Sequence, residues 1–337
     1  MAEARTPEPA SEPVLAVRDL RVHFVRRGQP PVRAVDGVDF EVGAGEVVGI
    51  VGESGSGKSV TSMAIMGLLP RRGVQVTGAA DYRGQNLLQL SPDRLARLRG
   101  NDLAMVFQDP MSSLNPVMTV GAQVAEVLLA HEKISKRAAR EESIDLLRRC
   151  GIPDPERRFG EYPHQLSGGM RQRALIATAL ACKPRLLICD EPTTALDVTI
   201  QAQILELLAE LVRGSGASMI MITHDLGVVA GLCDRVNVMY AGRIVETAPR
   251  RELFAHPRHR YTAGLLSSIP RLDAVRSERL VPIPGTPRDT IGWDAACAFA
   301  PRCRHATDAC VRPELELSGE AEHRWRCVHP AESEATQ

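Results

Sequence analysis

Gly52–Ser59 reads Gly-Glu-Ser-Gly-Ser-Gly-Lys-Ser and decides the fold of this 337-residue chain. The apolar run at residues 47–51 predicts a buried strand before it, and residues 58–69 are expected to form a helix after it. A strand, GxxxxGKS and a helix in this order are typical of a phosphate-binding P-loop. The glycines let backbone N–H groups turn towards a polyphosphate, and the helix N-terminus adds partial positive charge. The stretch therefore predicts nucleotide binding, and a Gly-rich turn without function is the weaker alternative.

The last two residues of the motif carry side chains suited to a bound nucleotide. Lys58 is expected to reach the β- and γ-phosphates, and the Ser59 hydroxyl is expected to ligate Mg²⁺. The rest of the loop and the residue after it are expected to surround the phosphates: Gly52, Glu53, Ser54, Gly55, Ser56, Gly57 and Val60.

Polar side chains also follow three later predicted strands. Gln108, the pair Asp190–Glu191 and His224 each come directly after a buried apolar run. The carboxyl ends of parallel strands meet at the edge where open α/β sheets bind ligands. Gln108 can offer its amide oxygen to Mg²⁺ or to the attacking water, and Asp190 can hold Mg²⁺. Glu191 can polarise that water; a lone histidine is more often structural, but the position of His224 favours contact with the γ-phosphate.

Two further features leave alternatives open. Phe24 ends a strand predicted at residues 15–24, where its ring could stack on adenine or face the core. Ser167 is expected to cap a helix whose first turn carries Gly168 and Gly169. Such a helix start can bind an anion, although this one lacks a lysine and an ordinary capped helix fits the spacing equally well.

Composition excludes several classes of protein. Lys+Arg and Asp+Glu are equal at 41 each, which gives no indication that the chain binds nucleic acid by bulk charge. No run approaches the roughly 18 apolar residues of a membrane span. Residues 1–13 hold three prolines, lack the order of a signal peptide and are predicted to be a disordered tail. The chain is therefore expected to be cytosolic and to reach a membrane only through partners.

Four of the eight cysteines lie in the last 41 residues: Cys297, Cys303, Cys310 and Cys327. Disulfides are disfavoured in the cytosol, so a metal site is the favoured interpretation. Zinc sites usually contain closely spaced cysteine pairs, and the wider spacing here suits a [4Fe–4S] cluster better, with Zn²⁺ and free thiols as the alternatives. Nearby arginines could offset thiolate charge or form a solvated surface: Arg302, Arg304 and Arg326.

These motifs together resemble the ATP-binding subunit of ABC transporters. Their order and spacing match the motifs of that family. Gly52–Ser59 looks like Walker A, Gln108 like the Q-loop and residues 166–170 like the signature. Residues 186–191 look like Walker B, residues 195–197 like the D-loop and His224 like the H-loop. The resemblance covers residues 14–250 and implies an α/β P-loop NTPase fold. It implies a RecA-like core, an antiparallel β subdomain and a helical subdomain at about residues 110–180. Residues 251–337 would form a small extension that carries the four cysteines.

Flanking residues resemble one branch of that family, the oligopeptide/dipeptide (peptide/nickel) importers. The matching stretches are VFQDP at residues 106–110, SLNP at 113–116, YPHQLSGGM at 162–170, HRYT at 259–262 and PIPG at 282–285. Met170 after the signature is typical of the D-type subunit. Ala296 departs from the family, which usually has Gly before the first of these cysteines, and the difference affects only a turn.

The resemblance implies partners and further site residues. The chain would pair with a second, F-type ATPase subunit, and Ser167, Gly168 and Gly169 would close on ATP held by that subunit, with Asp197 in the D-loop nearby. Two transmembrane permeases and an extracytoplasmic peptide-binding protein would complete an importer, with this chain peripheral at the cytoplasmic face of the inner membrane. Nickel or another small solute remains an alternative to peptides. Some family members carry a [4Fe–4S] cluster at the cysteines.

A soluble ABC-type ATPase acting on nucleic acid or ribosomes is the rival interpretation. Such proteins usually carry two ATPase cassettes in one chain or a long coiled-coil insertion, and this sequence has neither. The balanced charge also argues against it. The importer subunit is therefore the favoured hypothesis.

Overall fold

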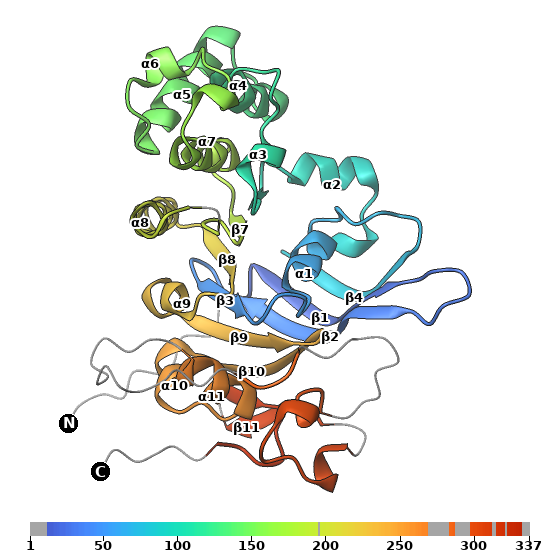
Figure 1. The fold of residues 1–337 in the computed structure, drawn as a ribbon. Helices are drawn as coiled ribbons and strands as arrows, with labels where there is room; N and C mark the ends of the chain where they lie inside the picture. The colour runs from blue at the N-terminus through green and yellow to red at the C-terminus, as the bar shows by residue number, and fades with distance from the viewer. Residues whose placement is uncertain are drawn as a thin grey trace, which may run out of the picture.

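A parallel sheet occupies the centre of the molecule (Figure 1). The computed structural model describes residues 12–194, 196–268, 283–286, 297–311, 315–320 and 322–331, so the predicted tail at residues 1–13 lies almost wholly outside it. The parallel strands, in the order in which they pair, are β9 (Arg235–Tyr240), β3 (Val47–Val51), β8 (Ser218–Thr223), β7 (Leu186–Asp190) and β6 (Leu103–Val106). Nearly every residue of these strands is buried, as the continuous apolar runs in the sequence predict for a sheet covered on both faces.

Three antiparallel strands extend this sheet beyond β9. They are β10 (Arg243–Pro249), β12 (His323–Trp325) and β11 (Ser318–Glu320), in that order. β9 and β10 pair as an antiparallel hairpin, with Gly242 in the connection between them. The pairing of β12 with β10 was not predicted, and it makes the end of the chain part of the central sheet.

A second, antiparallel sheet packs against the first. Its order is β2 (Val32–Val42), β1 (Leu15–Phe24), β4 (Val74–Tyr82) and β5 (Gln85–Asn86). Alternate residues of β3 serve two cores, because successive side chains of a strand point to opposite faces. Val48 and Ile50 belong to the core shared with the second sheet, and Val47 and Val51 belong to the other.

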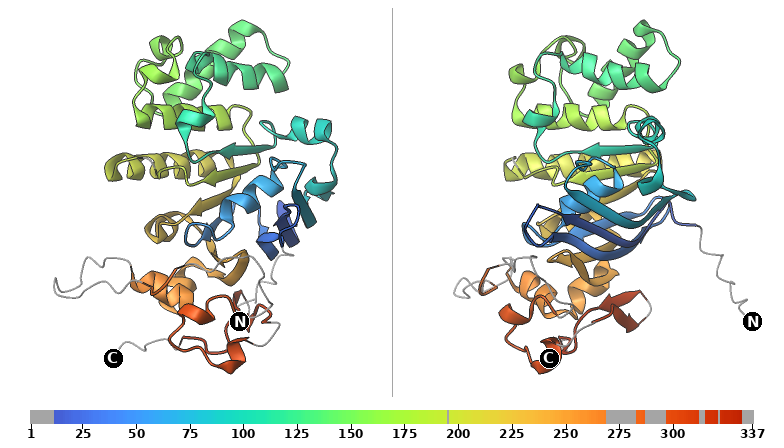
Figure 2. Two further views of the ribbon diagram at one scale, coloured as in Figure 1. Left: turned by 45° about the vertical axis from the view of Figure 1, so that its right-hand side comes forward. Right: turned by 90° about the vertical axis from the view of Figure 1, so that its right-hand side faces the viewer.

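Helices lie on both sides of the sheets (Figures 1 and 2). A group of five gathers at one end of the molecule: α3 (Pro110–Ser113), α4 (Val120–His131), α5 (Lys136–Arg149), α6 (Pro155–Arg158) and α7 (Gly168–Leu180). The others are α1 (Lys58–Ile65), α2 (Pro92–Leu98), α8 (Val198–Ser215), α9 (Leu226–Leu232), α10 (Arg250–Ala255) and α11 (Arg260–Ser267). Short 3₁₀ turns are η1 (Leu87–Gln89), η2 (Pro163–Gln165), η3 (Ala300–Arg302) and η4 (Asp308–Val311). In the described part of the chain, none of these helices combines the length and apolar character that a bilayer span requires.

The helix after the P-loop is shorter than predicted. The sequence predicts it over residues 58–69, but α1 ends at Ile65. Gly67 takes a left-handed conformation with φ of 60°, and a Cβ there would lie 2.4 Å from Leu95. The close approach of α2 therefore stops the helix where sequence periodicity alone would continue it.

Asp36 on β2 ties the two sheets together. Its buried carboxylate accepts hydrogen bonds from Arg21 on β1 (2.7 Å) and Arg243 on β10 (2.7 Å). Burial would raise the pKa of Asp36, but the hydrogen bond and charge of Arg243, with Arg21, outweigh it and hold the pKa below the ordinary 3.8. The ion pair is therefore a stabilising contact at neutral pH.

We expect Asp36→Asn to lower the free energy of unfolding by about 2 kcal/mol at pH 7, since two guanidinium groups lose their shared anion. Because the folded-state pKa of Asp36 is depressed, its contribution is present above pH 3.8 and is lost as the pH falls further. Urea denaturation at pH 7 and pH 3 measures both effects. Glu210→Gln, at an exposed position of α8, is the control. Equal stability of Asp36→Asn and wild type at pH 7 would contradict this role.

Candidate functional site

The P-loop lies against two strands so closely that only glycine fits at two of its positions. Gly52 has φ of 155°, and a Cβ there would lie 2.1 Å from the carbonyl oxygen of Met239 on β9. Gly57 has φ of 103°, and its Cβ would lie 2.4 Å from the carbonyl oxygen of Ala34 on β2. Both positions combine positive φ with a backbone contact, which excludes any side chain. The loop is thereby fixed at the carboxyl end of β3.

A cleft opens above this loop. It is lined by Gly52, Glu53, Ser54, Gly55, Ser56, Gly57, Lys58, Ser59, Val60, Gln108, Glu191, Thr194, His224 and Leu265. The structure thus brings together the whole predicted P-loop and three of the predicted strand-end residues. Leu265 comes from α11, so the C-terminal extension also reaches the cleft.

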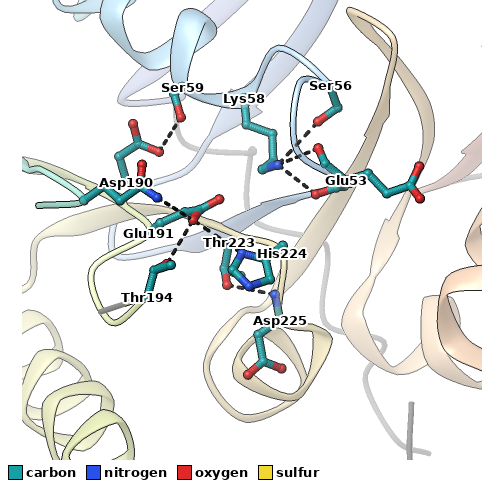
Figure 3. Close-up of polar contacts among 12 residues, drawn as sticks. Glu53, Ser56, Lys58, Ser59, Asp190, Glu191, Thr194, Thr223, His224 and Asp225 are labelled. Carbon is teal, nitrogen blue, oxygen red and sulfur yellow. Dashed lines mark hydrogen bonds and ion pairs between the residues drawn. The ribbon is translucent and has the colours of Figure 1, made fainter. Parts of the chain in front are cut away.

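Lys58 lies at the centre of the loop (Figure 3). Its Nζ donates hydrogen bonds to the carbonyl oxygens of Gly52 (2.7 Å) and Glu53 (3.0 Å). Burial lowers the pKa of Lys58, although the nearby carboxylates Glu191 and Asp190 favour its charged form. A buried ammonium bonded only to neutral oxygens can bind an anion without breaking an ion pair.

Ser59 and Asp190 meet where a divalent cation would be expected. The Ser59 hydroxyl donates to Asp190 Oδ1 at 2.9 Å. Burial raises the pKa of Asp190 above its usual value, and the neighbouring charge of Glu191 adds to the effect. A buried carboxylate beside a hydroxyl fits Mg²⁺, which prefers oxygen ligands and would offset this desolvation.

Three polar side chains at the cleft contact the carboxylate of Glu191. Its Oε2 accepts hydrogen bonds from Gln108 Nε2 (3.1 Å) and Thr194 Oγ1 (2.9 Å), and lies 3.4 Å from His224 Nδ1. Its backbone has φ of 47°, and its N–H donates to Ile222 on β8 at 2.9 Å. This left-handed conformation costs about 1 kcal/mol or more in a non-glycine residue.

Gln108 contributes differently from the sequence prediction. Its amide nitrogen donates to Glu191, and no hydrogen bond joins it to Ser59 or Asp190 among the described contacts. The structure therefore associates Gln108 with the carboxylate expected to act on water. Its role as a Mg²⁺ ligand stays a prediction.

Several predicted residues lie outside the cleft lining. Ser167 caps α7 by accepting from Met170 N (3.3 Å), and Asp197 caps α8 by accepting from Ile200 N (3.0 Å). Gly168 and Gly169 begin α7, facing Leu196 and Ile200. Phe24 ends β1 opposite Val74 and packs partly against the core. None of these residues contacts the chain's own P-loop through a described hydrogen bond, and their nucleotide contacts stay predictions.

The sequence reasoning missed residues that support the loop. Thr194 lies three residues after Glu191, in a position where a hydroxyl beside an acidic pair could have been noticed. Tyr261 Oη accepts from Glu53 N at 2.8 Å, and Arg302 forms an ion pair with the Glu53 carboxylate at 2.6 Å. These two residues lie 208 and 249 positions from Glu53, and no local pattern connects them.

The four C-terminal cysteines line one small cavity, together with His259, Phe299 and Leu315. All four are free thiols, and burial raises the pKa of Cys297 to about 11. Among the residues that the structure describes, no three His, Cys, Asp or Glu side chains are grouped so that they could hold a metal ion. Two of the three nearby arginines have other partners: Arg302 pairs with Glu53, and Arg326 donates to the carbonyls of Ile244 and Leu315.

Comparison with known proteins agrees with this geometry. Residues 35–194 match the ABC transporter family, and residues 245–310 match the C-terminal region of oligopeptide/dipeptide transporters. The dipeptide transport ATP-binding protein DppD of Bacillus subtilis is 54% identical over 89% of this chain and 90% of its own. A putative peptide import ATP-binding protein of Brucella ovis is 52% identical over 94% of this chain and 97% of its own.

Solved structures give the same result for the fold. A bacterial ABC transporter cassette, solved as a dimer, superposes with a TM-score of 0.63 at 28% identity and covers 70% of this chain and 99% of that one. The CbiO1 subunit of the ABC transporter complex CbiONQ from Clostridium perfringens superposes with a TM-score of 0.60 at 29% identity, over 73% of this chain and 92% of that one. The chain therefore belongs to the ABC transporter family of ATP-binding proteins, and its C-terminal part to the oligopeptide/dipeptide transporter branch of that family.

Proposed function

We propose that this chain binds and hydrolyses ATP as an energising subunit of a membrane importer of di- or oligopeptides. The observation that carries the ATPase assignment is the position of Glu191, held by Gln108, Thr194 and His224 at the edge of the P-loop cleft. The peptide class rests on the named relatives, which are described as peptide import and dipeptide transport proteins. Nickel or another small solute is the alternative cargo.

Each of these residues has a separate role in the proposed binding and hydrolysis of ATP. Lys58 exchanges its bonds to the Gly52 and Glu53 carbonyls for bonds to the β- and γ-phosphates. Ser59 and Asp190 would hold Mg²⁺, which neutralises phosphate charge when bound. Glu191 accepts a hydrogen bond from the attacking water and polarises it, while His224 contacts the γ-phosphate. Gln108 and Thr194 keep the Glu191 carboxylate oriented.

A second ATPase subunit completes the site in this proposal. Ser167 and Gly168 are exposed at the start of α7, so their backbone N–H groups are open to an anion brought by another molecule. A related cassette has been solved as a dimer. We propose that Ser167, Gly168 and Gly169 close on ATP bound to an F-type partner, with Asp197 beside that interface.

The membrane partners would dock near Gln108. Phe107, Met111 and Val117 expose 38%, 57% and 79% of their surfaces there, unusually large fractions for apolar side chains. Two permease subunits and an extracytoplasmic peptide-binding protein complete the proposed importer. The chain would be peripheral, at the cytoplasmic face of the inner membrane. In its proposed organisation, residues 14–250 form the ATPase domain, with a helical part at about 110–180, and residues 251–337 form the extension.

We further propose that the four-cysteine cavity holds a [4Fe–4S] cluster. Cys297, Cys303, Cys310 and Cys327 all face it, and each iron of such a cluster takes one thiolate. The wide spacing of the four cysteines along the sequence is the ground for preferring a cluster to zinc, whose sites usually contain closely spaced cysteine pairs.

Glu191→Gln is expected to reduce steady-state ATP turnover by about 100-fold or more, because the amide cannot polarise water as a carboxylate does. ATP affinity should change by less than about twofold, since the phosphates are held by Lys58 and the loop. Turnover is measured in the complex with the second ATPase subunit, and nucleotide titration of the purified chain measures the affinity. Glu206→Gln, exposed on α8, is the matched control. Unchanged turnover in Glu191→Gln would remove this residue from the catalytic role.

Purification of the tagged chain from its own membranes in mild detergent tests the importer assignment. Mass spectrometry is expected to identify two permeases, a second related ATPase and a peptide-binding protein, because the proposed ATP site is completed only by another subunit. Ribosomal proteins or nucleic acid without a membrane partner would favour the soluble alternative instead.

Anaerobically purified protein is expected to contain about four iron and four sulfide per chain. Cys303→Ser should lose most of both, because the cluster loses a ligand. Cys182→Ser, whose thiol lies outside the cavity beside Val127, should lose neither. One zinc per chain would support the alternative metal, and a metal-free wild type would contradict the cluster.

A further inference from the structure

The P-loop carries a carboxylate whose charge is neutralised from the far end of the chain. Arg302 donates to Glu53 Oε2 (2.6 Å) and Oε1 (3.1 Å), a two-point contact. Only 5% of the Arg302 side chain is exposed, and its Nε donates to the Pro284 carbonyl at 2.8 Å. Both Arg302 and Pro284 belong to the C-terminal extension. This ion pair therefore joins a buried arginine of the extension to the partly exposed carboxylate of the nucleotide loop.

The backbone of the same residue is held by a second group from the extension. Glu53 N donates to Tyr261 Oη at 2.8 Å, and Tyr261 is fully buried on α11. Its ring packs against Tyr240 and Phe299, with ring centroids 4.6 and 5.4 Å away. Phe299 immediately precedes η3, which ends at Arg302. The two contacts to Glu53 thus rest on one packed aromatic cluster.

The charge of Glu53 matters because of where it lies. Glu53 follows Gly52 in the loop and lines the cleft in which the negatively charged phosphates of ATP would bind. An unpaired carboxylate there would repel those phosphates, and the repulsion is strong where protein excludes water. The planar guanidinium of Arg302 matches the carboxylate at two points and remains charged at all working pH values.

We propose that Arg302 and Tyr261 are positioning residues of the nucleotide site, Arg302 by neutralising Glu53 and Tyr261 by fixing its backbone. This inference rests on the proposed binding of ATP at the P-loop. The extension is then part of the ATP site rather than an appendage to it. Leu265 of α11, which lines the cleft, belongs to the same arrangement.

A double-mutant cycle on the full-length chain tests the role of Arg302. The dissociation constant for a fluorescent ATP analogue with Mg²⁺ is measured for wild type, Arg302→Gln, Glu53→Gln and the double variant. Arg302→Gln is expected to weaken binding about tenfold, because it leaves Glu53 charged and unpaired beside the phosphates. Glu53→Gln completes the cycle, and the double variant should recover to within about threefold of wild type, because it no longer places an unpaired carboxylate beside the phosphates. Arg304→Gln, at the exposed neighbouring arginine, should change nothing.

Recovery in the double variant separates the proposed role from a purely structural one. If Arg302 only anchors the extension, removing Glu53 as well cannot restore affinity, and the double variant stays as weak as Arg302→Gln. That result, or unchanged affinity in Arg302→Gln, would overturn the inference. Thermal unfolding checks that each variant folds. Where Arg302→Gln does not fold, restored folding and affinity in the double variant still support the inference, and their absence overturns it.

Tyr261→Phe tests the second contact. It keeps the buried ring and removes only the hydroxyl that accepts from Glu53 N, so affinity should fall about fivefold with little change in the unfolding midpoint. Unchanged affinity would remove Tyr261 from the proposal. A wild type that binds no nucleotide would contradict the proposed function itself, which is distinct from failure of these variants.

Discussion

The position of the P-loop depends on two glycines that lie directly on neighbouring backbone. Gly52 contacts the carbonyl of Met239, and Gly57 contacts the carbonyl of Ala34, at distances that no Cβ could share. These contacts join the loop to β9 of one sheet and β2 of the other. Lys58 and Ser59 follow immediately, so their side chains start from a fixed backbone. The packing of the two sheets therefore fixes the backbone of the phosphate site before any nucleotide binds.

The parallel sheet then brings the remaining polar groups to the same edge. Gln108, Asp190 and His224 are widely separated in sequence, but the strands that precede them are neighbours or near neighbours of β3. Asp190 and Glu191 are adjacent at one strand end, but they bond different partners. Glu191 has a left-handed backbone conformation; Asp190 accepts from Ser59, and Glu191 accepts from Gln108 and Thr194.

Sequence reasoning predicted what local patterns encode and missed what depends on the folded chain. The P-loop, the buried strand before it and the cap at Ser167 all carry their signals within a few residues, and the structure contains each of them. The early end of α1 depends on the approach of Leu95 to Gly67, which periodicity cannot express. The partner of Glu53 lies 249 residues away, and nothing near either residue indicates the pairing.

The C-terminal extension shows why such distant contacts matter for function. It joins the ATPase core through two ion pairs, Glu53 with Arg302 and Glu246 with His323, the latter pair 2.7 Å apart. Arg302 is buried, and Glu246 is fully buried and also accepts from the backbone of His259 before α11. A buried charge that lost its partner would be strongly unfavourable, so neither ion pair can open without cost to the core. The cysteine segment that contains Arg302 is therefore held in a fixed position relative to the P-loop. A structural change in that segment would move Arg302 and thereby alter its contact with Glu53 in the loop that would bind ATP.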